Sequence, residues 1–412
     1  MSDSCAIDGL MRLEEVLDIL IHSVPPVTEV ESVSLEESLG RILAKEIISP
    51  INVPSHDNSV MDGYALRLSD LQTTDCLPLA GQSLAGHPFS GKVPSGSCIR
   101  IMTGASIPQG ADTVIMQEQT EMADEQIRFL NKPDRTGNNI RYAGEDIPCG
   151  SRVFIPTRRV RPQDIGLLAT LGISTVNVYR KVKVAVFSTG DELRLPGEAL
   201  GQGDIYDSNR FVIKAMLQRM NADILDLGKI ADDKEALRKA FFNADEQADA
   251  VISSGGVSVG DTDYIKEILD EQGETKCWKL AIKPGKPFTF GQLPNSVFFG
   301  LPGNPVSATV TFQQLTAPAL RHMMNQAAVN NVELTLATQS SLKKKPGRRD
   351  FQRGKLVKDQ AGKLQVISSG NQGSGVMSTL NQSDCYIVLP EEAGNIDAGS
   401  FITVQLFDEL LS

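Results

Sequence analysis

The sequence predicts a multi-domain α/β protein whose central unit is a mostly parallel sheet with helices on both faces. Three observations support this fold class. The chain has 412 residues, more than one ordinary hydrophobic core accommodates. Strand and helix patterns alternate from residue 181 to about residue 326. Short β patterns broken by glycine and proline occupy regions before and after this alternation.

The N-terminal region predicts helices before and after a stretch of short β patterns. Residues 12–24 carry apolar side chains at helical spacing, and residues 35–44 repeat the pattern behind Ser34, which suits a helix cap. Helical character returns at residues 162–171, which begin with a proline. We therefore expect the two ends of this region to join into one N-terminal helical, linking domain.

Between these helices the sequence changes to short β patterns. Candidate strands occupy residues 98–102, 113–116 and 126–130, with glycine and proline turns around them. This pattern is typical of a small β domain, which is inserted into the helical domain. The strand-rich region from about Asn331 onward indicates a second one, a C-terminal β-barrel-like domain or sandwich.

The central region contains strands and helices in alternation. The strands are expected at residues 182–187, 224–227, 248–252, 278–282 and 297–299. The helices are expected at residues 208–220, 233–244, 261–269 and 305–322. The expected domains are residues 1–49 with 147–180 (helical, linking), 50–146 (inserted β), 181–326 (α/β) and 327–412 (C-terminal β).

Composition and charge exclude several functional classes. The net charge of −11 disfavours binding to nucleic acid or to an anionic membrane. No apolar stretch approaches the length of a membrane span and the N-terminus lacks a secretory pattern, so a cytoplasmic protein is expected. The six cysteines and four histidines are scattered, which argues against a zinc site or a disulfide framework.

The loop after the predicted strand at 248–252 has the composition of a phosphate-binding turn. Glycines allow close approach of the backbone, hydroxyls donate hydrogen bonds, and the following helix offers free N–H groups. The candidate binding residues of this turn are Ser254, Gly255, Gly256, Ser258 and Gly260. Asp261 and Asp263 would repel a bare anion, but Mg²⁺ between phosphate and carboxylate removes that conflict. The alternative is that Asp261 only caps the helix.

Other loops of the central region carry complementary groups. In an open parallel sheet, the loops at the carboxyl ends of the strands meet at one edge, where ligands bind. Carboxylates there suit Mg²⁺, and lysines suit phosphate. The residues concerned are Glu192, Asp207, Asp232, Lys279, Lys283, Lys286, Pro302, Pro305 and Ser307. Each has a structural alternative, because Asp207 and Asp232 also suit helix caps and residues 283–286 also suit an exposed turn.

Seven motifs spread over most of the chain resemble one family. The sequence lacks the glycine-rich motifs of dinucleotide dehydrogenases and P-loop enzymes. The motifs lie at residues 57–65, 101–105, 144–147, 188–193, 254–260, 283–287 and 300–305. They are similar to those of the molybdopterin molybdenumtransferase family, which includes the bacterial MoeA type and the gephyrin E-domain type. His56 and Val60 depart from the usual pattern, but neither position is assigned to chemistry.

The resemblance implies an activity and an assembly. Members of this family insert molybdate into the dithiolene of adenylylated molybdopterin and release AMP, with Mg²⁺ present. They are elongated four-domain homodimers whose active site lies between the subunits. The implied supplier of the substrate is a molybdopterin adenylyltransferase, and the implied recipients of the product are acceptor molybdoenzymes.

The resemblance also assigns roles to single residues. Asp62, Thr103 and Asp146 would close the cleft from the partner subunit. Glu192, Asp232 and Asp263 would be catalytic residues and Mg²⁺ ligands beside the pterin and phosphate at residues 254–260. Molybdate, a tetrahedral dianion, needs cationic, N–H or O–H donors. The donors implied are Lys283 or Lys286, Ser307, Arg349 or Arg353, and Ser374.

Several alternatives stay open at this point. The chain could catalyse the preceding step, the adenylylation of molybdopterin by ATP, because the central region alone resembles enzymes of that step. It could also be a binding or scaffold protein that keeps the fold without turnover. Tungstate or another oxyanion could replace molybdate. The basic segment at residues 346–353 also suits a solvated turn.

Overall fold

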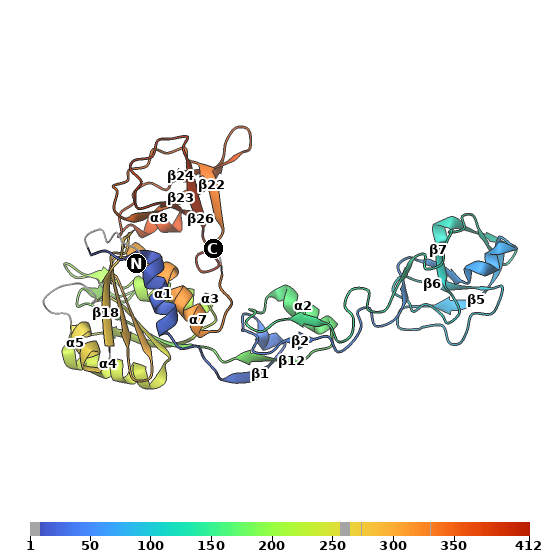
Figure 1. Ribbon diagram of the computed structural model, residues 1–412, viewed down its shortest axis with the longest axis horizontal. Coiled ribbons are helices and arrows are strands. Elements are labelled where there is room, and N and C mark those ends of the chain that lie inside the picture. The colour runs from blue at the N-terminus through green and yellow to red at the C-terminus, as the bar shows by residue number, and fades with distance from the viewer. Residues whose placement is uncertain (1–8, 256–263, 273, 330) are drawn as a thin grey trace, which may run out of the picture.

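The structure is a computed structural model, and it describes residues 9–255, 264–272, 274–329 and 331–412. The molecule is elongated (Figure 1). A β-rich body forms one end, a narrow middle part follows, and a larger body at the other end contains the central sheet and the C-terminal strands. The expected domain boundaries stay a prediction, but the multi-domain α/β fold class is confirmed.

The central sheet has six strands and is mostly parallel. Its order is β16 (Asp223–Ile230), β13 (Lys183–Thr189), β17 (Ala250–Ser254), β21 (Val297–Leu301), β20 (Pro287–Gln292) and β18 (Glu274–Lys279). The first four strands are parallel, and β20 and β18 continue the sheet antiparallel. The sequence did not predict β20, and it placed β18 four residues too late. The parallel core of the sheet is as expected.

Both faces of this sheet are covered by helices. Val184 and Val186 of β13 belong to a core shared with α3 (Asn209–Arg219), whereas Ala185 and Phe187 belong to a core shared with α4 (Lys234–Gln247) and α5 (Tyr264–Gln272). Successive strand residues point to opposite faces, so a strand buried on both sides is apolar at every position. The predicted helix at 305–322 is a continuous run of α6 (Pro305–Thr311), the π-helical η4 (Phe312–Thr316) and α7 (Ala317–Met323).

The helix predicted at residues 35–44 is wrong. Only a short 3₁₀ segment, η1 (Glu36–Ser38), forms there, and Gly40 follows it at a positive φ of 73°. The buried Ile42 packs into the central core and its neighbour Leu43 into the core of the linking region. Two adjacent residues that face separate cores need extended backbone, which a helical reading of the apolar spacing misses.

The other N-terminal elements surround this segment. The predicted helices are confirmed as α1 (Leu13–Ser23) and α2 (Pro162–Thr170). Two short antiparallel ladders build the narrow middle part of the molecule. They pair β1 (Val30–Ser34) with β12 (Thr175–Tyr179), and β2 (Ile47–Ile48) with β11 (Arg152–Phe154).

The β-rich body contains a six-stranded sheet, and the three strands predicted there are confirmed. Its order is β7 (Thr113–Met116), β4 (Gly63–Leu66), β6 (Cys98–Ile101), β5 (Cys76–Ser83), β9 (Gln126–Phe129) and β8 (Thr120–Ala123). A short ladder of β3 (Asn58–Ser59) with β10 (Ile140–Arg141) lies beside it. The 3₁₀ segments η2 (Leu68–Gln72) and η3 (Gln117–Gln119) complete this body.

The C-terminal sheet incorporates a strand from the central region. Its order is β19 (Ile282–Lys283), β23 (Arg349–Lys358), β25 (Cys385–Leu389), β26 (Phe401–Leu406) and β22 (Glu333–Ala337), with β24 (Leu364–Ser368) on β23. The short helix α8 (Met377–Asn381) precedes β25. Because β19 pairs with β23, the lysine-bearing turn after β19 is fixed against the C-terminal sheet. Among helices of the described residues, none has the length and apolar character to span a bilayer.

We predict that Gly63→Ala strongly destabilises the β-rich body. A Cβ at residue 63 would lie 2.1 Å from the carbonyl oxygen of Ile115 on the paired strand β7, so the sheet would have to open. Gly166→Ala in α2 is the control, because its Cβ meets no atom within 4 Å and alanine favours a helix by about 0.5–1 kcal/mol. Calorimetric unfolding should show a lower transition temperature only for the first variant.

Candidate functional site

A cavity of about 350 Å³ lies at the carboxyl ends of the parallel strands. Loops that are far apart in sequence build it, as expected for an open parallel sheet. They follow β13, β17 and β21 and include the short parallel pair β14 (Leu193–Arg194) and β15 (Ile205–Tyr206). The lining residues are Thr189, Glu192, Leu193, Ile205, Tyr206, Asp207, Ser208, Asn209, Ser254, Gly255, Gly303, Asn304, Pro305 and Gly375.

Gly255 holds the ends of three strands together. It has a positive φ of 91°, and a Cβ there would lie 2.7 Å from the carbonyl oxygen of Thr189 at the end of β13. Its N–H donates to the carbonyl of Leu301 at the end of β21, at 3.2 Å. Only glycine permits this approach. Gly256, Ser258, Gly260 and Asp263, also predicted for this turn, lie outside the described residues.

A buried hydroxyl lies in the cavity without a partner. Thr189 lines the cavity and is 4% exposed, and its Oγ1 makes no hydrogen bond with the described residues. A buried polar atom without a hydrogen bond costs about 1–3 kcal/mol, so such atoms are rare unless a ligand or water uses them. The Thr189 hydroxyl is therefore a candidate partner for a polar ligand group at this strand end. The sequence prediction missed this residue, although its strand-end position was a usable signal.

Asp207 lines the cavity but is committed to a structural network. Its carboxylate accepts a hydrogen bond from Ser188 Oγ at 2.6 Å and pairs with Arg210 Nε at 3.0 Å. It also accepts the backbone N–H of Arg210 at 3.3 Å, whereas Ser208 makes no side-chain cap bond. The cap alternative is thus correct for Asp207, whose carboxylate, and not the Ser208 hydroxyl, accepts a backbone N–H at the start of α3. Arg210 in turn pairs with Asp226.

Asp232 belongs to an acidic cluster and does not cap a helix. Burial raises its pKa, and the nearby carboxylates of Asp191 and Glu192 raise it further. The cap of α4 is its neighbour Asp233, which accepts the N–H groups of Glu235 and Ala236 at 3.1 and 2.9 Å. Among the described residues no group of three or more acidic, histidine or cysteine side chains is arranged to hold a metal. The expected third ligand Asp263 lies outside them, so the Mg²⁺ ligand set stays a prediction.

The predicted lysines, Pro302 and Ser307 do not line this cavity, whereas the predicted Pro305 does. Lys279 and Lys286 are exposed, while the Lys283 ammonium lies 3.2 Å from the Asp350 carboxylate. Pro302 and Ser307 are buried beside the lining residues Asn304 and Pro305. The lysine turn nevertheless packs on α6, because a Cβ at Gly285 would lie 2.5 Å from Thr311 Oγ1.

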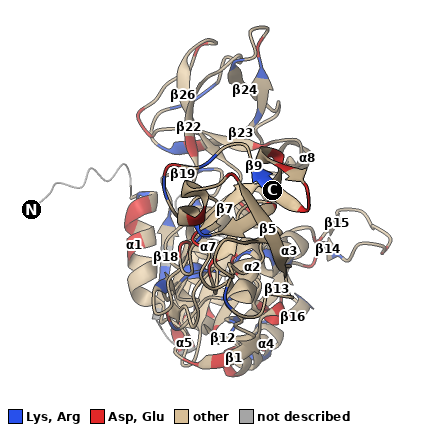
Figure 2. Ribbon diagram, turned by 90° about the vertical axis from the view of Figure 1, so that its right-hand side faces the viewer, with Lys and Arg blue, Asp and Glu red and all other residues tan. Residues whose placement is uncertain are grey.

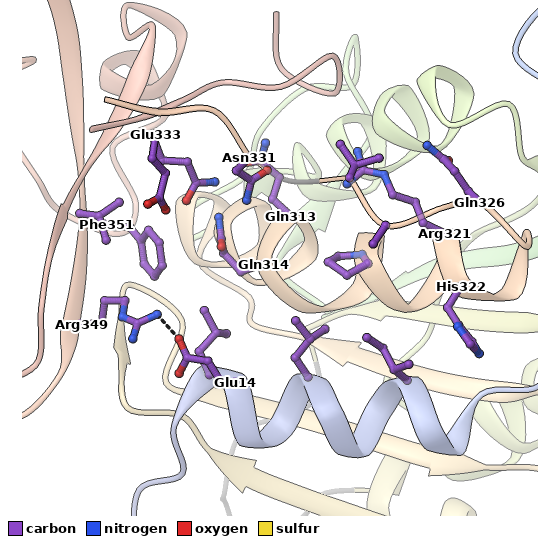
Figure 3. Close-up of a pocket in the computed structure, with 18 residues that line it drawn as sticks. Glu14, Gln313, Gln314, Arg321, His322, Gln326, Asn331, Glu333, Arg349 and Phe351 are labelled. Atoms are coloured by element: carbon purple, nitrogen blue, oxygen red, sulfur yellow. Dashed lines mark hydrogen bonds and ion pairs between the residues drawn. The ribbon is translucent and has the colours of Figure 1, made fainter. Parts of the chain in front are cut away.

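The two predicted arginines have structural partners. Arg349 pairs with Glu14 of α1 and with Glu391, and it lines a separate cavity of about 490 Å³ (Figure 3). Arg353 is 1% exposed and donates to the carbonyls of Asn371 and Gly373 at 3.1 and 3.0 Å. It therefore supports the loop that brings Gly375 to the first cavity.

That loop also reaches α6 directly. The backbone carbonyl of Ser374 accepts the N–H of Val306 at 3.0 Å. Asn209 Nδ2 also donates to the carbonyl of Gly303 at 2.8 Å. These two bonds close the rim of the cavity. Asn209, Asn304 and Gly375 were not among the predicted binding residues, and the Gly375 contribution has no local sequence signal.

Asp62, Thr103 and Asp146 lie in the part of the chain away from the cavity. Asp62 immediately precedes β4, whose sheet is at the opposite end of the molecule from the central sheet (Figure 1). The N–H and Oγ1 of Thr103 both donate to Asp62 at 2.7 Å, and these hydrogen bonds lower the pKa of Asp62. Asp146 is exposed beside Val53. Within one chain these residues do not meet the cavity.

Comparison with known proteins covers almost the whole chain. Residues 11–172 match the MoeA N-terminal region (domain I and II), 185–322 a probable molybdopterin binding domain, and 335–407 the MoeA C-terminal region (domain IV). A molybdopterin molybdenumtransferase of Haemophilus influenzae is 46% identical over 98% of this chain and 100% of its own length. One of Bacillus subtilis is 33% identical over 92% and 90%. A crystal structure of a molybdopterin biosynthesis moeA protein from Pyrococcus horikoshii gives a TM-score of 0.83 at 28% identity, covering 97% and 100%.

We predict that Asp191→Asn or Glu192→Gln lowers the pKa of Asp232 towards its ordinary value. Each change removes a negative neighbour that favours the protonated form. Because the folded-state pKa of Asp232 is raised, its stabilising contribution is present at low pH and is lost as pH rises through that pKa. Carboxyl ¹³C NMR titration measures the shift. Asp223→Asn, on the exposed start of β16, should leave the pKa of Asp232 unchanged.

Proposed function

Because this chain belongs to the molybdopterin molybdenumtransferase family, we propose that it inserts molybdate into adenylylated molybdopterin and releases AMP. The observation that carries this proposal is the cavity at the carboxyl ends of the parallel strands. Its lining combines the buried Thr189 hydroxyl and the close backbone turn at Gly255 with Glu192, which belongs to the acidic cluster beside the cavity. A ligand that carries phosphate and polar ring atoms suits this combination.

The acidic cluster supports a role for Mg²⁺ at this cavity. Asp191, Glu192 and Asp232 carry oxygen atoms of the kind that Mg²⁺ prefers, although the described acids alone are not arranged as a metal site, and the repulsion that raises the pKa of Asp232 would fall when a cation binds. When bound, Mg²⁺ would polarise the pyrophosphate and neutralise charge on the leaving AMP. Glu192 and Asp232, with Asp263, would hold the cation. The chain's contribution is then to position substrate and to balance charge.

The remaining residues are assigned by position. Gly255 would let the pterin phosphate approach the strand ends closely, and the turn after it, which lies outside the described residues, stays a predicted phosphate-binding segment. Water attacks the phosphorus of the pterin phosphate as the bond from that phosphorus to the bridging oxygen breaks. AMP leaves with the bridging oxygen and its electron pair, the pterin phosphate keeps the oxygen of water, and the proton passes to solvent. Arg353 would act by fixing the loop at residues 371–375 and not by touching molybdate, because its donors already serve Asn371 and Gly373.

We further propose that the working unit is a homodimer. Asp62, Thr103 and Asp146 lie too far along the elongated chain to reach their own cavity without a partner subunit (Figure 1). The hydrogen bonds of Thr103 hold the Asp62 carboxylate in place, which supports a role for this carboxylate at the cavity of a second subunit. We propose a molybdopterin adenylyltransferase as supplier and apo-molybdoenzymes as recipients, all in the cytoplasm.

We predict that Glu192→Gln and Asp62→Asn each reduce AMP release at least about 100-fold, because each removes an interaction used at the reacting pyrophosphate. The measurement uses adenylylated molybdopterin, molybdate and Mg²⁺ with the purified chain. Asp18→Asn, on the exposed side of α1, should keep full activity. Pyrophosphate production from Mg-ATP and molybdopterin would favour the adenylylation alternative, and substrate binding without AMP release would favour a scaffold.

We predict that mixing Asp62→Ala with Glu192→Gln restores activity that neither variant has alone. If each site uses Asp62 of one subunit and Glu192 of the other, a mixed dimer has one intact site and one doubly changed site. Random exchange makes roughly half of the dimers mixed, so activity should recover to about a quarter of the wild-type value. No recovery after verified subunit exchange would contradict a shared site.

A further inference from the structure

A second polar cavity, of about 550 Å³, lies at one end of the C-terminal sheet. It is built from the segment before β23, the turn between β25 and β26, and β19. Its lining residues are Lys283, Lys343, Lys344, Lys345, Pro346, Arg348, Asp350 and Asn395. None of them lines the cavity at the carboxyl ends of the central strands. The two cavities are therefore distinct places on the molecule.

This second cavity is strongly basic on an acidic protein. Five of its eight lining residues are lysine or arginine, and one is acidic, although the chain as a whole has a net charge of −11. Basic residues colour the chain near β19 and β22 in Figure 2. A concave surface lined by one sign of charge focuses the electric field and concentrates ligands of the opposite sign.

Three of these cations have no partner of their own. Lys343, Lys345 and Arg348 make no side-chain hydrogen bond or ion pair with the described residues. By contrast, Arg180 is matched to Asp249 and Arg158 to Asp164. Like charges held close together repel, so an unmatched group of cations favours binding of an anion.

The frame that carries the free cations is rigid. The Lys344 side chain is 5% exposed, and its ammonium donates to the carbonyls of Lys345, Glu391 and Ala393 at 3.0, 3.4 and 3.4 Å. The backbone N–H of Lys344 donates to Asn395 Oδ1 at 2.9 Å. These bonds fix the backbone of the segment against the β25–β26 turn. The backbone of Lys343 and Lys345 is therefore held in place before a ligand binds.

Asp350, the one acid among the described lining residues of this cavity, is already engaged. Asp350 is 3% exposed, lies 3.2 Å from the Lys283 ammonium, and accepts a hydrogen bond from Gln352 Nε2 at 3.1 Å. Its charge is thus balanced locally by Lys283. Asp350, Glu391 and Glu392 lie near the Lys344 ammonium, so the charge that a ligand would meet is that of the three free cations Lys343, Lys345 and Arg348.

We propose that this cavity binds a compact polyanion of the phosphate class, namely a diphosphate or triphosphate group, free or at the end of a nucleotide. One phosphate group carries about −1.5 to −2 at neutral pH, so two or three linked groups match the uncompensated cations better than a single oxyanion does. The cavity volume also exceeds what a single tetrahedral oxyanion fills. This inference does not rest on the proposed enzymatic function.

The test is calorimetric titration of the full chain with sodium pyrophosphate at low salt and without divalent cations. A triple variant (Lys343→Gln, Lys345→Gln and Arg348→Gln) removes the free cations and keeps the hydrogen bonds of Lys344 to the β25–β26 turn. We expect its affinity for pyrophosphate at this site to fall at least about tenfold. The control Lys239→Gln, Lys355→Gln, Lys358→Gln changes the net charge equally at exposed positions outside the cavity, and it should shift the affinity less than about twofold.

The outcomes separate the possibilities. Equal pyrophosphate binding by the wild type and the cavity variant, or no binding by the wild type, overturns the proposal. Orthophosphate or molybdate binding as tightly as pyrophosphate at this site overturns the assignment to linked phosphates. If ADP binds more tightly than pyrophosphate, the source is a nucleotide, and equal affinities indicate a free diphosphate. Far-ultraviolet circular dichroism checks that both triple variants remain folded.

Discussion

The burial of the central strands on both faces is the constraint from which the rest of the structure follows. Val184 and Val186 pack against one helical layer and Ala185 and Phe187 against the other, so β13 can lie only inside the sheet. Its parallel neighbours are then joined by helices that return each chain segment to the same edge. The polar loops are gathered at that edge because the connecting helices bring each parallel strand back in the same direction, while apolar side chains cover both faces of β13.

Specific contacts hold the loops that follow β13, β17 and β21 in place. Gly255 contacts Thr189 and Leu301, and Asn209 contacts Gly303, so four segments share one rim. Beneath them Asp207 and Arg210 form a buried pair that leaves neither charge uncompensated. Removing one partner of such a pair typically costs about 3–5 kcal/mol, which makes it a determinant of local shape. The binding edge is therefore preformed.

Much of this arrangement could be predicted from the sequence, and the exceptions have physical causes. Alternation of strands and helices predicted the parallel sheet, and the loops bearing Glu192, Ser254 and Pro305 do meet at its edge. Sequence could not separate Asp232 from Asp233, because either residue suits a cap and only the backbone path selects one. It also treated Arg349 and Arg353 as alternatives for one role.

The two arginines illustrate a general limit of sequence reasoning. They lie four residues apart on β23, so both point to the same face of the strand, yet one meets α1 and the other the loop at residues 371–373. Those neighbours come from segments more than 300 residues apart in one case and about 20 in the other. The local sequence pattern determines which face of the strand a side chain lies on, but tertiary packing determines which residues it contacts on that face.

The pairing of β19 with β23 couples two parts of the chain mechanically. Ile282 and Lys283 belong by sequence to the central region, but their backbone is a strand of the C-terminal sheet, and the turn after them is wedged on α6 through Gly285. A rotation of the C-terminal sheet would therefore move this turn and displace α6, whose first residue, Pro305, lines the cavity. The short strand β19 thus links the C-terminal sheet to α6. Weakening its pairing with β23, or the contact of Gly285 with α6, would change the position of the other.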